Sequence, residues 1–294
     1  MISGPWVRTW KQRMQVYAID NDVDIPTGFI AKTIWWGPYA EMLAKRVKLK
    51  AGIRKPDGKL DGDLRKILRN VDVSTLKPPY TGIDVSNHQA FIDWNAVRGD
   101  AQNIKFAWAK CTEGATFVDR WYDNNKTGAR KNKIKFGAYA WIKPGTVSYV
   151  VSQIDHLLDH IDYKKGDLAP AIDWEETAAA SPAYVNALEA GVNRIHEKLG
   201  VWPVMYGGYY VLAPMRIPSN SVIKNCPLWL PAYGRNDGGR YESAIPGVPT
   251  PWKNFLNPLA KGWDVHQYTS NGRVSGIPGP VDMNYSIVRI EDLM

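Results

Sequence analysis

The chain has 294 residues, of which 45% are hydrophobic and 22% charged, so it is neither a disordered nor a fibrous protein. No run of about 18 apolar residues occurs, so we expect no membrane span. Two cysteines, Cys111 and Cys226, are too few for a disulfide framework and lack metal-ligand spacing. We therefore expect two packed free thiols and neither a metal nor a cofactor.

The basic charge is concentrated in the first quarter of the chain. Residues 1–79 carry 15 Lys and Arg against 8 Asp and Glu, a net charge of +7, while residues 80–294 carry only +1. This division indicates an accessory segment that binds polyanions beside a separate working domain. The chain also has 13 Trp and 15 Tyr against 6 Phe. Rings with a polar edge suit a cleft for a flat-faced, hydroxylated ligand such as a sugar, although core packing also explains many of them.

The first segment is predicted to be helical. Apolar residues recur at helical spacing over Thr9–Ala18, and a second helix is expected to open at Pro38. A third helix is expected to start in DGDLRKIL, with Asp61 or Asp63 as its N-cap.

The linker VDVSTLKPPY follows, because consecutive prolines break a helix and stiffen the chain. We therefore predict two domains: a basic helical module over 1–79 and a second domain over 80–294.

From residue 80 the pattern alternates between short β-type runs and helical stretches. The expected strands cover 81–86, 105–112, 135–142, 169–175, 202–207, 228–233, 263–268 and 281–285, and the expected helices cover 119–132, 147–161 and 182–198. This alternation favours a parallel α/β fold, and eight strands favour a closed barrel. Gly/Pro-rich loops join the last three strands. The predicted fold is thus an irregular TIM-like (β/α) barrel whose last three strands lack full helices, preceded by the helical module.

Four carboxylates fall on the ends of three predicted strands. Asp84 ends the first strand, Asp173 and Glu175 end the fourth, and Asp282 begins the last. Chemistry in such barrels occurs at the carboxyl ends of the strands, and strands one and eight of a closed barrel are neighbours. Residues two apart on a strand share a face, so Asp173 and Glu175 should both point to the barrel mouth.

Crowding of these acids has a chemical consequence. Like charges a few ångströms apart raise the pKa of at least one carboxyl, which then keeps its proton near neutral pH. A protonated acid beside ionised carboxylates is what glycosidic bond cleavage requires. Taken singly, each aspartate could instead be a structural hydrogen-bond acceptor.

At these residues the sequence resembles glycoside hydrolase family 25, the lysozymes that cut the β-1,4 bond between N-acetylmuramic acid and N-acetylglucosamine of peptidoglycan. The resemblance covers about 205 residues and rests on an ordered set of motifs: GIDVSNHQ (82–89) with Ile92-Asp93-Trp94, KCTEG (110–114), GAYAWI (137–142), IDWE (172–175), MYGGY (205–209), LWLPAY (228–233), WDVHQYTSNGRVSGIPGPVD (263–282) and Asn284. Two positions depart from the family pattern, Ala140 in place of His and Ala232 in place of Gln, and they affect subsite contacts rather than the carboxylates.

The resemblance implies that Glu175 is the general acid/base and that Asp173 assists by orienting the substrate acetamido group. Asp84 and Asp282 would complete an acidic floor. The substrate-binding residues would be Tyr139, Tyr206, Trp229 and Gln267, with Lys110 and Glu113 near the rim. Alternatively, Lys110 and Glu113 form an ordinary ion pair, and Tyr139 and Trp229 belong to the barrel core. His88 would form hydrogen bonds near Asp84 rather than act as a catalytic base, since no nucleophilic triad is apparent.

Other functions stay open at this point. The D-W-E ending also resembles chitinases of glycoside hydrolase family 18, but Leu168 and Ala171 occupy the positions of the first two aspartates in that signature. A chitinase-like or glucosaminidase-type enzyme is therefore the alternative, together with a non-catalytic glycan-binding protein and a virion-associated lysin.

The expected partners follow from the leading interpretation. Glycan strands of peptidoglycan would be the substrate, and residues 1–79, which faintly resemble three-helix peptidoglycan-binding modules through WWGP and PDGKLDGDL, could bind anionic wall polymers. No motif supports nucleic-acid binding, and we expect a monomer. Because no secretory signal is visible, we expect a bacteriophage endolysin that stays in the host cytoplasm until lysis and then acts at the cell wall.

Overall fold

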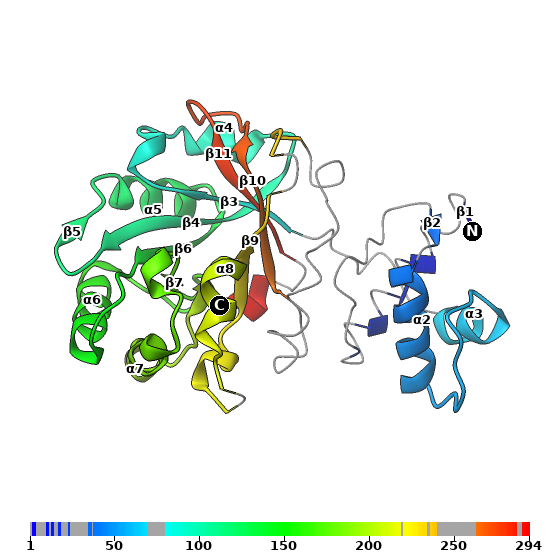
Figure 1. Cartoon of the computed structure of the whole chain (residues 1–294). Helices are drawn as coiled ribbons and strands as arrows, with labels where there is room; N and C mark the ends of the chain where they lie inside the picture. The colour runs from blue at the N-terminus through cyan, green and yellow to red at the C-terminus, as the bar shows by residue number, and fades with distance from the viewer. Residues whose placement is uncertain are drawn as a thin grey trace. The chain divides into compact units, whose positions relative to one another are not determined.

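The computed structural model describes residues 2–3, 10–11, 13–14, 17–18, 23, 35–36, 38–69, 80–218, 220–233, 236–239, 263–286 and 290–294. These residues form two compact units, one lying before residue 79 and the other from residue 80 onward (Figure 1). None of the described helices is long and apolar enough to cross a membrane.

The N-terminal unit combines a short antiparallel strand pair with helices. Its elements are β1 (Ile2–Ser3), β2 (Trp35–Trp36), α2 (Pro38–Lys50) and α3 (Gly62–Leu68). Two predicted helix starts are confirmed: α2 begins at Pro38, and Asp61 caps α3 by accepting a hydrogen bond from the Leu64 backbone N–H at 3.0 Å. The described residues of the predicted helix over 9–18 are helical, and most of the predicted linker lies outside the described residues.

A small apolar core holds this unit together. Residues of α2 at helical spacing pack against α3 and the preceding helical residues: Met14, Ala18, Ala40, Leu43, Ala44, Val47, Leu60, Leu64 and Leu68. Lys48 is buried beside this core, and its ammonium lies 2.7 Å from the carboxylates of both Asp57 and Asp61. Two of the acids in this segment therefore neutralise a buried cation.

The second unit contains a closed eight-stranded barrel with helices outside it, which confirms the predicted fold class (Figure 1). Its strands are β3 (Tyr80–Val85), β4 (Ile104–Glu113), β6 (Lys135–Trp141), β7 (Ala171–Asp173), β8 (Val204–Tyr206), β9 (Leu228–Pro231), β10 (Val265–Gly272) and β11 (Val281–Ser286). The order around the barrel is β3-β11-β10-β9-β8-β7-β6-β4, and pairing of β4 with β3 closes it. The short β5 (Phe117–Val118) extends β4 as a hairpin.

The helices are regular in the first part of the barrel and short in the second. They are α4 (Trp94–Gly99), α5 (Tyr122–Lys131), α6 (Val147–His160), α7 (Val185–Leu199) and α8 (Tyr209–Leu212), with 3-10 turns at Asn87–Gln89, Thr177–Ala179, Pro182–Tyr184, Ala213–Met215, Val222–Asn225 and Ile290–Leu293. Thr146 caps α6 through a 3.2 Å bond from the Tyr149 N–H, and α7 ends at Gly200 in the left-handed region (φ 73°). Both cysteines are free and buried, as predicted.

One strand does not follow the expected parallel order. β11 runs antiparallel to both of its neighbours, β10 and β3, so the prediction of an all-parallel sheet is wrong at this position. The physical reason lies in the connection before it. Residues 273–280 contain no helix, and eight residues suffice for a hairpin-type return but not for a parallel crossover, which needs about a dozen or more.

Large aromatic rings fill the inside of the barrel below its carboxyl end. Phe106 and Trp108 point inward from β4, and they fit because their paired positions on the neighbouring strands β3 and β6 are Gly82 and Gly137. A Cβ at these glycines would lie 2.2 Å from the Phe106 ring and 2.5 Å from the Trp108 indole nitrogen, respectively. Trp108 stacks on Trp229 with ring centroids 4.7 Å apart. This packed floor closes the barrel from below, so the side chains one step further along each strand face a pocket that opens at one end.

Candidate active site

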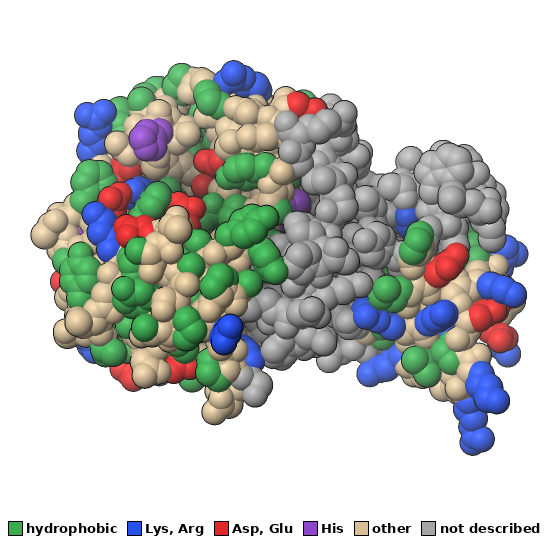
Figure 2. Space-filling model, viewed as in Figure 1, with side chains coloured by type: hydrophobic (Ala, Val, Ile, Leu, Met, Phe, Trp, Pro, Cys, Tyr) green, Lys and Arg blue, Asp and Glu red, His purple; other side chains and the backbone are tan. Residues whose placement is uncertain are grey.

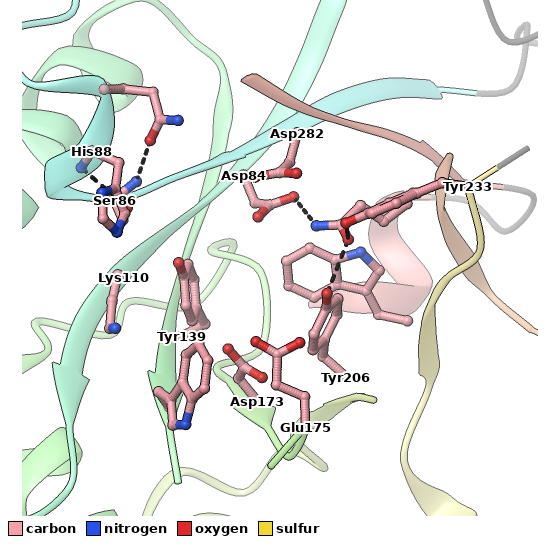
Figure 3. A pocket seen from close by; sticks show the side chains of 14 residues that line it. Asp84, Ser86, His88, Lys110, Tyr139, Asp173, Glu175, Tyr206, Tyr233 and Asp282 are labelled. Atoms are coloured by element: carbon pink, nitrogen blue, oxygen red, sulfur yellow. Dashed lines mark hydrogen bonds between the residues drawn. The ribbon is translucent and has the colours of Figure 1, made fainter. Parts of the chain in front are cut away.

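The pocket at the carboxyl end of the barrel is built by strand alternation. On β4 the inward sequence is Phe106, Trp108 and then Lys110, which is the first of the three to reach the pocket. The same step carries β3 from Gly82 to Asp84. The residues that line the pocket are Asp84, Ser86, His88, Gln89, Lys110, Tyr139, Trp141, Asp173, Glu175, Tyr206, Trp229, Tyr233, Gln267 and Asp282 (Figure 3).

The four predicted carboxylates come together in this pocket (Figure 3). Asp282 pairs directly with Asp84 across the β11–β3 ladder. The antiparallel direction of β11 explains this position, because a residue that begins an antiparallel strand lies at the same barrel end as residues that finish parallel ones. Asp173 finishes β7, and Glu175 follows two residues later on the same face.

Asp84 is held by two side-chain amides. Its Oδ2 accepts hydrogen bonds from Gln267 Nε2 at 2.9 Å and from Asn284 Nδ2 at 2.7 Å. Each amide is anchored in turn through its oxygen: Trp229 Nε1 donates to Asn284 Oδ1 at 2.7 Å, and both Tyr206 and Tyr233, which follows β9, donate to Gln267 Oε1. Two amide N–H groups aimed at one buried oxygen favour the ionised form of Asp84.

Asp173 and Glu175 are bonded differently from Asp84. Asp173 is 5% exposed, and its Oδ1 has no hydrogen-bond partner among the described residues, so this oxygen is free to accept a bond from a substrate. Glu175 is partly buried, and the neighbouring Tyr206 hydroxyl favours its ionised form. The unpartnered oxygen and the acid therefore face the same pocket from positions two residues apart in the chain.

The pKa of every carboxyl in the cluster is raised. Burial is the leading cause for Asp84 and Asp173, whose pKa values lie well above the usual aspartate range, with repulsion from Asp282 and Glu175, respectively, adding to it. Burial raises the pKa of Asp282 to about 6, with the charge of Glu175 as the second cause. Because the groups interact, their protons leave in steps that belong to the cluster as a whole.

The pKa of Glu175 is also raised, with burial as the leading cause. The neighbouring Tyr206 hydroxyl and the positive charge of Lys110 oppose the rise. The charge of Glu175 in turn raises the pKa of Asp84, Asp173 and Asp282, so the expected repulsion acts within the cluster and burial adds to it.

Lys110 supplies the positive charge in the pocket. Its ammonium forms an ion pair with Glu113 and lies 5.1 Å from the centroid of the Trp141 ring. Glu113, which also lies 3.5 Å from the Lys143 ammonium, does not line the pocket and instead holds Lys110 from the rim. The alternative of an ion pair is thus what the structure shows for these two residues, although Lys110 itself reaches the pocket.

The remaining predicted residues Tyr139, Tyr206, Trp229 and Gln267 all line the pocket. Tyr139 and Trp229 also pack with the aromatic floor, so the cleft and core interpretations hold together for both. Sequence reasoning did not assign Ser86, Gln89, Trp141 and Tyr233 to the pocket, and gave His88 only a supporting position. Trp141 lies two residues after Tyr139, and Tyr233 lies four residues after Trp229. Both therefore fall on the two-residue period of inward positions that the sequence already indicated.

The arrangement suits proton transfer to and from an uncharged, hydroxylated ligand. A buried acid, ionisable partners and aromatic walls with polar edges are present in one cavity. Among the residues that the structure describes, no group of three or more His, Cys, Asp or Glu side chains is arranged to hold a metal ion.

Comparison with known proteins identifies the fold family. The sequence model of glycosyl hydrolases family 25 matches residues 83–277. Lysozyme M1 from Streptomyces globisporus is 26% identical over 227 residues, which cover 72% of this chain and 71% of that lysozyme. A lysozyme structure from Streptomyces coelicolor has a TM-score of 0.59 and 22% identity, covering 74% of this chain and 96% of the other.

A second similar structure is the catalytic domain of endolysin ply40 from bacteriophage P40 of Listeria monocytogenes, with a TM-score of 0.55 and 21% identity over 74% of this chain and 97% of that domain. The range matched by the family contains Asp84, Asp173 and Glu175, and Asp282 follows five residues after it. The chain therefore belongs to glycosyl hydrolases family 25 and is a glycoside hydrolase of the lysozyme type.

Proposed function

We propose that this enzyme hydrolyses the β-1,4 bond between N-acetylmuramic acid and N-acetylglucosamine in peptidoglycan, with Glu175 as the proton donor to the glycosidic oxygen. The observation that carries this proposal is the position of Glu175: a partly buried carboxyl with a raised pKa, two residues after Asp173, at the open end of the barrel. A carboxyl that keeps its proton near neutral pH can donate it to the leaving oxygen.

Asp173 is proposed to position the substrate. Its Oδ1 is buried and has no partner among the described residues, so it can accept the N–H of an acetamido group on the sugar that undergoes cleavage. Holding that group would direct its carbonyl oxygen at the anomeric carbon, as in a substrate-assisted route. The negative charges of Asp84 and Asp282 would stabilise the positive charge that develops on the sugar ring.

The direct test uses purified peptidoglycan and two adjacent variants. Glu175→Gln keeps the shape of the side chain but cannot donate a proton, so release of reducing ends should fall at least about a thousandfold. Glu176→Gln is the matched control, because Glu176 does not line the pocket and its side chain accepts a long hydrogen bond of 3.4 Å from Trp141 Nε1, which a glutamine oxygen can also accept. Muramic acid at the new reducing ends would support the proposal, whereas N-acetylglucosamine would favour a glucosaminidase or chitinase-like enzyme.

We further propose that the enzyme acts as a bacteriophage endolysin. Its support is the similarity to the catalytic domain of the ply40 endolysin together with a basic N-terminal unit. An endolysin should lyse cells from inside once the cytoplasmic membrane is permeabilised. Cells that express the protein and then receive a membrane-permeabilising agent should therefore clear, while cells that express Glu175→Gln should not. Presence of the protein in purified phage particles would instead indicate a virion-associated lysin.

The N-terminal unit is proposed to bind anionic polymers of the cell wall. Residues 38–69 contain ten Lys and Arg against four Asp and Glu, and two of those acids are already paired with buried Lys48. Of the remaining cations, Arg46 is half-buried and the others, among them Lys45, Arg54 and Lys55, are exposed; Figure 2 shows Lys and Arg side chains spread over this unit. Such a surface attracts polyanions over a range that salt shortens.

Wall binding can be measured without digestion in the Glu175→Gln background. Sedimentation with walls should weaken when salt is raised and when teichoic acids are extracted from the walls. Replacing Arg54 and Lys55 with Gln should weaken it as well, while the same replacement at Lys131 and Lys198, two exposed lysines of the barrel unit, should have little effect. Equal losses for both pairs would contradict a binding role for the N-terminal unit.

A further inference from the structure

The Gln267 side chain joins two tyrosines to Asp84. Its Oε1 accepts hydrogen bonds from the Tyr206 hydroxyl at 2.9 Å and the Tyr233 hydroxyl at 2.6 Å, and its Nε2 donates to Asp84 Oδ2 at 2.9 Å (Figure 3). An amide oxygen has two acceptor sites, so both are occupied. Gln267 is only 2% exposed, so bulk water cannot readily replace a partner that leaves.

The Tyr206 hydroxyl has a single hydrogen, and two neighbouring groups can accept a hydrogen bond from it. Its hydroxyl donates to Gln267, and it lies beside Glu175, whose ionised form it favours as a hydrogen-bond partner (Figure 3). When Glu175 is protonated, the carboxyl can donate to the Tyr206 oxygen while Tyr206 donates to Gln267. When Glu175 is ionised it can only accept, so the Tyr206 hydrogen must turn away from Gln267. The protonation state of the acid thus decides whether Gln267 keeps this donor.

We propose that Tyr233 is a positioning residue, which holds Gln267 and through it Asp84 while Tyr206 turns its hydrogen toward Glu175. This inference rests on the proposed function, in which the O–H bond of Glu175 breaks as its proton forms an O–H bond on the departing glycosidic oxygen. The electron pair of the broken C–O bond stays on that oxygen. Both tyrosines keep their protons, and only the direction of the Tyr206 O–H changes.

The position of Tyr233 suits this task. It follows β9 at the rim, with its side chain 41% exposed while its hydroxyl reaches a buried amide. Without it, Gln267 Oε1 would have no hydrogen-bond donor in the described pocket once Tyr206 turned, and the amide could rotate and withdraw its N–H from Asp84. An unpaired buried acceptor is unfavourable, so loss of Tyr233 should keep the Tyr206 hydrogen on Gln267 and deprive the Glu175 carboxylate of its donor.

The charged and titratable groups that face Glu175 determine the electrostatic environment in which the Tyr206 O–H changes direction. They are Asp173 on β7, Asp84 on β3, Asp282 on β11, Lys110 on β4, Tyr206 on β8 and Tyr233 after β9. A tyrosine-to-phenylalanine change leaves the charges of the carboxylates and of Lys110 in place. A change in the pH profile of such a variant therefore reports the lost hydroxyl.

The experiment compares Tyr233→Phe, Tyr206→Phe and the double variant by their pH dependence of kcat and KM on soluble, alternating peptidoglycan oligosaccharides. For Tyr233→Phe we expect kcat to fall about tenfold and KM to stay unchanged. The alkaline limb of the kcat–pH profile should move to higher pH, because the Glu175 carboxylate loses its hydrogen-bond donor. Tyr206→Phe should move the limb further. The double variant should match Tyr206→Phe in the position of the alkaline limb, because Tyr233 acts on Glu175 through the Tyr206 hydrogen, but its kcat should be lower, because Gln267 then loses both tyrosine donors. Tyr210→Phe, at a tyrosine that is 86% exposed on α8, is the control.

An alkaline limb that does not move in Tyr233→Phe, or a limb shift that adds fully to that of Tyr206→Phe, would overturn the inference. A change confined to KM would do so too, since it would make Tyr233 a sugar contact. A loss of thermal stability without a shifted limb counts against it in the same way. If Glu175→Gln retains activity, the proposed function itself fails, whereas an inactive Glu175→Gln with an unchanged Tyr233→Phe profile refutes only this inference.

Discussion

Replacing Asp282 with Asn should stabilise the protein at neutral and alkaline pH. Burial, reinforced by the charge of Glu175, raises the Asp282 pKa from 3.8 to about 6 in the folded protein. Between those pH values the folded state keeps a proton that the unfolded state has lost. Stability contributed by this proton is complete below the unfolded pKa and disappears as the pH rises through the folded pKa. Above about pH 6, therefore, the folded state bears the full cost of a desolvated carboxylate.

The size of this cost follows from the shift. A difference of about 2.2 units, at 1.36 kcal/mol per unit, corresponds to about 3 kcal/mol at pH 8 and to about 0.5 kcal/mol at pH 4. Asp282→Asn removes the charge and keeps the shape, so it should raise the free energy of unfolding by about these amounts. For a unit of this size, about 3 kcal/mol corresponds to a Tm increase of about 6–12 °C.

Urea unfolding at pH 4, 6 and 8, followed by tryptophan fluorescence, measures the predicted gain. Asp159→Asn, at an exposed carboxyl on α6, should show no gain at any of these pH values. A gain for Asp282→Asn that is the same at pH 4 and pH 8 would indicate better packing rather than removal of a charge. A variant that is less stable than the parent at pH 8 would refute the reasoning, because the carboxylate would then be better solvated or bonded than its burial implies.

Three further changes test other parts of the site and its floor. Lys110→Met should lower the free energy of unfolding by only about 1–2 kcal/mol, because its partner Glu113 is partly exposed and remains close to Lys143. The same change should raise the pKa of Glu175 further, so the alkaline limb of the kcat–pH profile should move to higher pH. Asn284→Ala leaves a buried indole N–H and a buried aspartate each short of one bond, so urea unfolding should show a loss of about 2 kcal/mol, together with reduced activity. Gly82→Ala should destabilise the barrel by about 1–3 kcal/mol, since the new Cβ meets the Phe106 ring at 2.2 Å, and Phe106→Leu in the same chain should recover part of the lost Tm.

The sequence predicted the position of the carboxylates better than it predicted the sheet. Strand ends and the two-residue period sufficed to bring Asp84, Asp173 and Glu175 to one rim, because these features are local. The direction of β11 was missed even though its signal was present: the eight residues before Val281 are too few for a parallel crossover. Counting that connection would have given the antiparallel strand and the correct reason for the position of Asp282.

Features that depend on distant parts of the chain had no comparable signal. Gln267 and Asp84 are 183 positions apart in the sequence. They meet because β10 and β3 are the two neighbours of β11 in the closed barrel. No pattern in the sequence distinguishes a glutamine that donates to an aspartate from one that contacts a sugar. The cause of the raised Glu175 pKa was inaccessible for the same reason, because burial is a property of the packed barrel.

The aromatic floor explains why burial is the leading cause of the raised Glu175 pKa. Phe106 and Trp108 occupy the barrel below the pocket, and the two glycines that face them allow the rings to fill it completely. The carboxyls just above this floor are therefore hydrated only from the open end. A desolvated carboxyl is a costly anion, which makes the same group a ready proton donor near neutral pH and a source of instability above it. A substitution that makes this pocket wetter, such as Trp108→Ala, should therefore lower the pKa of the acid and move the alkaline limb of activity to lower pH, opposite to the direction expected for loss of Lys110.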